Sequence, residues 1–463
     1  MPSLSYQFRR AVITETRACL YLAIPLATAQ LIQTATGFVD MVMMGMLGSS
    51  TLAAGGLGAN LFTFSLMIAT GTVSAVSPLV AAAHGAGQPQ QVTAIARQGL
   101  WFALFLAVPL TVMGLCGTPL LLALGQQPET VVRTQIYLDA IAWGYVPALL
   151  FAALRSVVSA LSKPRSVMVI VMVGTVVNII GNYTLMFGKF GFPALGLAGI
   201  GWASVLSLWV MLGLLIGYIF RQPSLRAYGI VQQFPWLEWK PLQVLLQVGL
   251  PIGCMMAVET GMFAITSFLM GHLGTIPLAA HQIALQSSAL SFNIPLGISF
   301  ATTIRVGYWF GLRDWAGARL AGWVGIGLGG VTMLLTALLF LGVPRWVVGL
   351  YLDVKDPANA AVLDLATRLL GVAAVFQLVD GMQVNASGAL RGLQDTRVPL
   401  AIAIVAYWGV GLSSGSFLSR RWGWGAVGLW WGLALGLTVA AIVLSLRFYQ
   451  RTRSGLRGKD VEG

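Results

Sequence analysis

Three acidic residues stand in stretches that are otherwise apolar: Asp40 in QTATGFVDMVMMG, Glu259 in PIGCMMAVETGMFAITSFLMG and Asp380 in AAVFQLVDGMQVNASG. A charged side chain at the centre of a bilayer costs about 3 kcal/mol, so an acid kept at that depth usually faces a polar cavity and binds an ion or a proton. The alternative interpretation is structural, because a protonated carboxyl group can bond to a neighbouring amide and hold two helices together. Both interpretations remain open for each acid.

Amide side chains could complete such sites. Asn178 and Asn182, in VGTVVNIIGNYTLM, are four residues apart and therefore share one face of a helix. We expect Asp40 to lie near one of them, and we expect Glu259 and Asp380 to lie close together. Carboxylate, amide and hydroxyl oxygens suit a hard cation such as Na⁺, and a carboxyl group in apolar surroundings can also load and release a proton. The sequence does not separate Na⁺ from H⁺.

Other chemistry has little support. The three cysteines and three histidines show neither a disulfide framework nor metal-ligand spacing. An intramembrane enzyme would need a nucleophile with a base, or a metal cluster, at membrane depth, and no such set occurs. We therefore expect no enzyme activity, no cofactor beyond the coupling ion, and no metal other than Na⁺ at Glu259 and Asp380. Most other acids, Glu15 among them, fall in loops or near the ends of apolar runs, where we expect them to be solvated.

The composition indicates what holds these residues in place. Of the 463 residues, 57% are hydrophobic and 9% are charged, against roughly 25% charged in a soluble protein. Apolar runs of about 20 residues, long enough to cross a bilayer, occur about twelve times. Their length favours helices over the short alternating strands of a membrane barrel. The sequence predicts an all-α integral membrane protein. The runs lie near residues 16–38, 52–83, 96–118, 130–160, 166–188, 195–220, 242–270, 277–310, 317–343, 361–390, 398–419 and 424–448.

The net charge of +13 is explained by basic residues that gather on one side of the membrane. If the N-terminus is cytoplasmic, most of the 27 Lys and Arg residues fall at the inner ends of the runs or in inner loops, which is the positive-inside pattern. We therefore expect a multi-pass protein of the plasma (inner) membrane with both termini in the cytoplasm, and no nucleic-acid partner.

The chain also repeats itself. Residues 44–54, MGMLGSSTLAA, recur as residues 270–280, MGHLGTIPLAA, and the same spacing pairs Pro25 with Pro251. Two copies of six spans keep one orientation across the membrane, so they should be parallel repeats related by an axis along the membrane normal. In transporters built this way the substrate path lies between the copies. The predicted organisation is an N-terminal six-helix bundle over residues 1–220, a cytoplasmic linker over 221–241 and a C-terminal six-helix bundle over 242–463.

Five segments together carry a resemblance to a known family. They are AIPLATAQLIQTATGFVDMVMMGMLG, VVNIIGNYTLMFGKFGFPALGLAGIG, VGLPIGCMMAVET, LAAHQIALQSSALSFNIPLGISFATTIRVGYWFG and FQLVDGMQVNASGALRGLQDT, and they are spread over nearly the whole chain. As a set they resemble the MATE family of multidrug and toxic compound extrusion proteins, in its NorM-like branch.

The resemblance implies an antiporter that exports small organic, often cationic, compounds in exchange for Na⁺ or H⁺. It implies the cation-binding acids of the C-terminal bundle at Glu259 and Asp380, an N-terminal site for a proton, cation or substrate at Asp40, Asn178 and Asn182, and a helix-bending proline at Pro25. Some sodium-linked members carry a tyrosine one helical turn before the second acid, where this chain has Phe376, so the coupling ion stays open. The expected partners are the lipid bilayer and the transported compounds, and we expect a monomer.

One alternative function belongs to the same superfamily. A flippase for lipid-linked oligosaccharides would line its cavity with several basic residues to hold a pyrophosphate. In this sequence nearly every Lys and Arg lies near the end of an apolar run, which favours the efflux antiporter.

Overall fold

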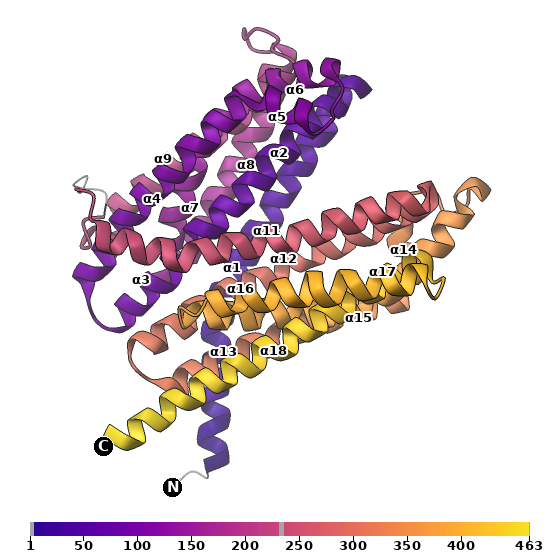
Figure 1. Ribbon diagram of the computed structural model, residues 1–463. Coiled ribbons are helices and arrows are strands. Elements are labelled where there is room, and N and C mark those ends of the chain that lie inside the picture. The colour runs from indigo at the N-terminus through magenta and orange to yellow at the C-terminus, as the bar shows by residue number, and fades with distance from the viewer. Residues whose placement is uncertain (1–3, 231–235, 463) are drawn as a thin grey trace. The chain divides into compact units, whose positions relative to one another are not determined.

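The computed structural model describes residues 4–230 and 236–462, and these residues form helices joined by short turns and loops (Figure 1). Twelve helical stretches in this part of the chain are long and apolar enough to cross a membrane. Helices satisfy their own backbone hydrogen bonds, which a chain in lipid must do. The prediction of an all-α membrane protein with about twelve spans is confirmed.

Packing divides the chain into two compact units. Residues Thr28–Gly253 form the first, which we call the N-terminal unit. Met1–Ala27 and Cys254–Gly463 form the second, which we call the C-terminal unit.

This division differs from the predicted boundaries of 1–220, 221–241 and 242–463. Helices α1 (Leu4–Met46) and α11 (Trp239–Leu273) each contribute to both units, and the change falls just after Pro25 in one and just after Pro251 in the other. A proline inside a helix removes a backbone hydrogen bond and permits a bend. Apolar periodicity does not reveal which neighbours the two ends of a long helix contact, so the sequence interpretation assigned each run to one bundle. Residues 231–235 of the predicted linker lie outside the described residues.

The N-terminal unit comprises the second part of α1, helices α2 to α10 and the first part of α11. Helix α8 packs along α9, and α6 contacts both α2 and α9. The helices are α2 (Ser49–Val73), α3 (Val76–Gly85), α4 (Pro89–Leu115), α5 (Gly117–Ala123), α6 (Pro128–Ile141), the short 3₁₀ helix η1 (Ala142–Gly144), α7 (Tyr145–Ala160), α8 (Pro164–Phe187), α9 (Leu197–Arg221) and α10 (Pro223–Arg226).

The C-terminal unit is centred on α15, which packs against α12, α13 and α18 (Figure 1). One of its spans is interrupted by a π-helical segment, η3, which packs against α18. The helices are α12 (Thr275–Gly311), α13 (Trp315–Gly342), α14 (Pro344–Gly349), η2 (Pro357–Asn359), α15 (Ala360–Gly392), α16 (Arg397–Ile404), η3 (Val405–Leu412), α17 (Ser413–Arg420) and α18 (Gly425–Glu462).

The outward faces of the spans are apolar. On α13, Val331, Leu335 and Leu338 are each more than half exposed, while Ala337 and Phe340 of the same helix are buried. An exposed stripe of large aliphatic side chains is unfavourable in water and suits contact with lipid tails. The structure is therefore that of a multi-pass membrane protein.

Glycines allow the helices of the C-terminal unit to approach closely. A Cβ atom on Gly329 of α13 would lie 2.6 Å from the carbonyl oxygen of Gly381 on α15, and a Cβ atom on Gly381 would lie 2.6 Å from the carbonyl oxygen of Gly329. In lipid the hydrophobic effect does not drive helices together, so their association depends on van der Waals contact. Small residues at a crossing allow that contact to be extensive. The crossing positions Asp380, which precedes Gly381 in the chain.

Replacing Gly329 by Leu should destabilise the C-terminal unit, because the side chain would push α13 away from α15. Overpacking of this kind costs about 1–3 kcal/mol. Gly327→Leu is the matched control, since a Cβ atom at Gly327 has no heavy atom within 4 Å. Thermal unfolding of the two purified proteins in detergent should show a lower melting temperature for Gly329→Leu alone. Equal melting temperatures would contradict the close crossing.

Candidate cation and substrate sites

A cavity of about 380 Å³ lies within the N-terminal unit. Side chains from α1, α2, α6, α8 and α9 line it, and its apolar wall includes Met41, Met44 and Met211. Methionine side chains are flexible and polarisable, so they adapt to ligands of different shape. Among the described residues that line the cavity, Asp40 is the charged one, and Lys and Arg are absent.

Asp40 belongs to a chain of hydrogen bonds at this cavity. The Nδ2 atom of Asn182 donates to Oδ1 of Asp40 at 2.5 Å and lies 3.2 Å from Oδ1 of Asn178. The Nδ2 atom of Asn178 in turn donates to the hydroxyl of Ser204 at 3.1 Å. Both asparagines are buried, and their spacing of four residues on α8 turns both amides toward α1 and α9. The structure thus brings Asp40, Asn178 and Asn182 together.

This arrangement can bind a positive charge. Asp40 accepts its hydrogen bond from an amide, which leaves its charge uncompensated by any basic group in the cavity wall described here. The side-chain oxygen of Asn182 is buried and has no hydrogen-bond partner among the described residues. A carboxylate with nearby amide and hydroxyl oxygens can hold a proton, a small hard cation or the cationic group of an organic molecule.

A second polar cluster lies in the C-terminal unit. Glu259 of α11 and Asp380 of α15 are close enough to act on each other electrostatically, and Asp380 is 5% exposed. Buried polar atoms of Asp380, Gln383 and Tyr407 have no hydrogen-bond partner among the described residues. Leaving such an atom unsatisfied costs about 1–3 kcal/mol. Two carboxylates with further oxygens nearby are suited to bind a small cation.

Arg391 also belongs to this cluster, although its place near the end of an apolar run put it among the basic residues expected at the cytoplasmic side. Its side chain is buried, its Nη2 atom donates to the hydroxyl of Ser299 at 2.8 Å, and its charge acts on Glu259. A guanidinium so placed offsets part of the negative charge of the two acids. The position of Arg391 near the end of an apolar run does not indicate where its long side chain points. The sequence therefore does not predict that Arg391 lies beside the two acids.

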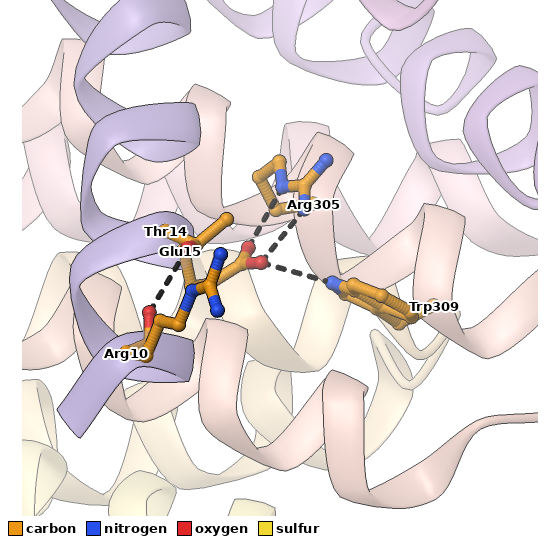
Figure 2. A network of polar contacts seen from close by, with 5 residues as sticks. All are labelled: Arg10, Thr14, Glu15, Arg305 and Trp309. Carbon is orange, nitrogen blue, oxygen red and sulfur yellow. Dashed lines mark hydrogen bonds and ion pairs between the residues drawn. The ribbon is translucent and has the colours of Figure 1, made fainter. Parts of the chain in front are cut away.

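Glu15 is the second residue that the structure corrects. Its carboxylate accepts hydrogen bonds from the side chains of Arg305 and Trp309 (Figure 2). The two from Nε and Nη2 of Arg305 measure 2.7 Å, and the one from the indole of Trp309 measures 3.2 Å. Glu15 is 4% exposed, so the expectation of solvation was wrong. Arg305 and Trp309 are four residues apart and share one face of α12. This network fixes the first part of α1 to α12 within the C-terminal unit.

Apolar spans, an internal repeat and polar clusters among the helices indicate a membrane transporter. The chain belongs to the MatE family, whose model matches residues 25–184 and 251–415. The two matches begin at Pro25 and Pro251, the equivalent positions of the internal repeat. The prediction of MATE membership is confirmed. Because members of this family are carriers, the protein is a transporter and not an enzyme.

Relatives match over nearly the full length. A probable multidrug resistance protein NorM from Synechococcus is 46% identical over 96% of this chain and 96% of its own. One from Pseudomonas aeruginosa is 43% identical over 95% of this chain and 90% of its own. A crystal structure described as MATE in the bent conformation has a TM-score of 0.87 at 20% identity, covering 97% of this chain and 98% of the other. At that identity the structural likeness shows the fold.

Replacing Glu15 by Ala should destabilise the protein, because it leaves the largely buried guanidinium of Arg305 without its counter-charge. Removing one partner of a buried ion pair costs roughly 3–5 kcal/mol. Asp364→Ala is the control, because Asp364 pairs with Arg368 on an exposed helix face where both side chains are about two-thirds exposed, and exposed pairs contribute about 0–1 kcal/mol. The melting temperature in detergent should fall far more for Glu15→Ala. A fall of equal size in both variants would rule out a structural role for the buried pair.

Proposed function

We propose that the protein is an antiporter of the plasma (inner) membrane that exports small organic, often cationic, compounds in exchange for Na⁺ or H⁺, with both termini in the cytoplasm. The observation that carries the proposal is the pair of acids formed by half-buried Glu259 and buried Asp380, beside polar atoms of Gln383 and Tyr407 that have no hydrogen-bond partner among the described residues. The names of the relatives, multidrug resistance proteins, support the substrate class.

In this proposal the organic substrate binds in the cavity of the N-terminal unit. Its volume lies in the range of about 300–1,000 Å³ that small-molecule sites occupy. Asp40 supplies the counter-charge, and the methionine-rich wall accommodates different apolar groups. The absence of Lys and Arg from the described lining disfavours a pyrophosphate, and hence disfavours the flippase alternative.

The coupling cation binds in the C-terminal unit. Two carboxylates within electrostatic reach repel one another, and a bound proton or Na⁺ relieves that repulsion. Arg391 offsets only part of it, since one guanidinium faces two acids. Cation binding therefore stabilises whichever conformation brings the two carboxylates closest. A substrate that prefers a different conformation is then linked to the cation through the populations of the two states.

Replacing Glu259 by Gln should abolish gradient-driven export and leave folding intact, because a neutral amide is easier to bury than a carboxylate. The test uses inverted vesicles that contain the full-length protein, with ethidium as a fluorescent organic cation. Na⁺ and H⁺ gradients are imposed separately. The wild type should accumulate ethidium against its gradient under at least one of them, and Glu259→Gln should fall at least about tenfold below it, given the cost of losing a charged ligand.

Glu129→Gln is the matched control. It makes the same chemical change at a carboxylate that is 84% exposed on α6, so its transport should equal that of the wild type. The proposal fails if Glu259→Gln exports ethidium uphill at the wild-type rate under both gradients, since Glu259 would then serve only helix packing.

A further inference from the structure

Tyr407 occupies an unusual position in the C-terminal unit. It lies on the π-helical segment η3, its side chain is fully buried, and its hydroxyl has no hydrogen-bond partner among the described residues. A tyrosine that is buried for packing alone usually places its hydroxyl against a partner. An interior phenylalanine would fill the same space without the cost of an unsatisfied hydroxyl.

The charged groups that act on this hydroxyl are the two acids of the proposed cation site. Both Glu259 and Asp380 act electrostatically on Tyr407. The adjacent Trp408 fixes the geometry, because its indole donates to the backbone carbonyl of Val258 at 3.1 Å, immediately before Glu259 in α11. Its ring also lies 3.2 Å from where a Cβ atom on Gly261 would be. Segment η3 is therefore held against the turn of α11 that carries Glu259.

The π-helical backbone explains how Tyr407 comes to lie there. A π-helical turn contains an extra residue relative to an α-helical turn, so it changes the direction of the side chains that follow, and such turns are frequent at functional sites. Glycines of α18 let the segment approach closely: a Cβ atom on Gly436 would lie 2.8 Å from the carbonyl oxygen of Ala406, the residue before Tyr407. The position of the tyrosine is thus set by contacts on both α11 and α18.

We propose that the hydroxyl of Tyr407 is a third oxygen of the cation site in the C-terminal unit. It directs a lone pair toward the bound cation, beside the two carboxylates. The phenol keeps its proton throughout, so Tyr407 tunes cation affinity and does not itself carry the transported proton. This inference rests on the proposed function, in which Glu259 and Asp380 bind the coupling cation.

If this inference is correct, replacing Tyr407 should lower the affinity for the driving cation without lowering the maximal transport rate. Tyr407→Phe removes one neutral oxygen and leaves both carboxylates in place, so transport should still saturate near the wild-type rate. The concentration of the driving cation that gives half the maximal rate should rise about three- to tenfold, as expected for the loss of one neutral hydrogen-bonding group. Because the hydroxyl has no protein partner among the described residues, its removal should not lower the melting temperature in cation-free buffer.

The experiment measures ethidium transport by the full-length protein in liposomes. Rates are recorded as a function of Na⁺ concentration at constant pH, and as a function of pH without Na⁺, for whichever ion drives the wild type. Tyr449→Phe is the matched control: it removes a tyrosine hydroxyl from the same unit, on α18, where the ring lies beneath the guanidinium of Arg319. Melting temperatures with and without the driving cation report binding directly, since a ligand that binds the folded state stabilises it.

A raised half-saturating concentration in Tyr407→Phe, with a smaller cation-induced thermal shift and no change in Tyr449→Phe, supports the inference. Wild-type cation dependence in Tyr407→Phe overturns it, as does a lower maximal rate at unchanged cation affinity, because either result makes Tyr407 a packing residue. Glu259→Gln, measured in parallel, distinguishes a failure of the proposed function from a failure of the role proposed for Tyr407. If that variant loses uphill transport while Tyr407→Phe behaves as wild type, the proposed function stands and only the role of Tyr407 fails.

Discussion

The cost of placing polar groups in an apolar, water-poor bundle is the constraint on which the other features depend. It explains why the chain spends most of its length on apolar helices, whose backbones bond internally. It also means that each buried polar group needs a specific partner or a ligand. Glu15 has found its partner in Arg305. Asp380, Gln383 and Tyr407 instead have buried atoms without a hydrogen-bond partner among the described residues, which leaves these atoms free to bind a ligand.

Each unit arranges its polar groups in its own way. The N-terminal unit contains a cavity whose described lining combines one acid with amides and methionines, a combination suited to organic molecules of varied shape. The C-terminal unit brings two acids and a guanidinium within electrostatic reach of one another, a combination suited to a small ion. The repeat therefore supplies the helical framework, because its matching positions include Pro25 and Pro251, whereas the chemistry differs between its copies. Helices α1 and α11 each contribute to both units, and each contains one of these prolines.

Much of the framework could be predicted from the sequence, because the length and polarity of the apolar runs are local properties. The spacing of Asn178 and Asn182 likewise predicted a shared face, and the structure joins that face to Asp40. Other features depend on contacts between distant segments. Glu15 meets Arg305 across 290 positions, and no local pattern marks that pairing. The π-helical turn that carries Tyr407 contacts α11 and α18, which are distant in sequence, and its apolar sequence is compatible with an ordinary helix. The division of α1 between the two units likewise depends on contacts between segments that are distant in sequence.

An exchange that couples export of an organic compound to entry of a cation must also run in reverse, and the reverse reaction tests this coupling most directly. Liposomes containing the wild-type protein would be loaded with ethidium and diluted into dye-free buffer, with Na⁺ and H⁺ at equal concentrations on both sides. By thermodynamic linkage the dye gradient alone must drive the coupling cation in the opposite direction. We predict a dye-dependent movement of Na⁺ or H⁺ that is absent when Glu259 is replaced by Gln. Dye efflux with no movement of either cation would contradict the account.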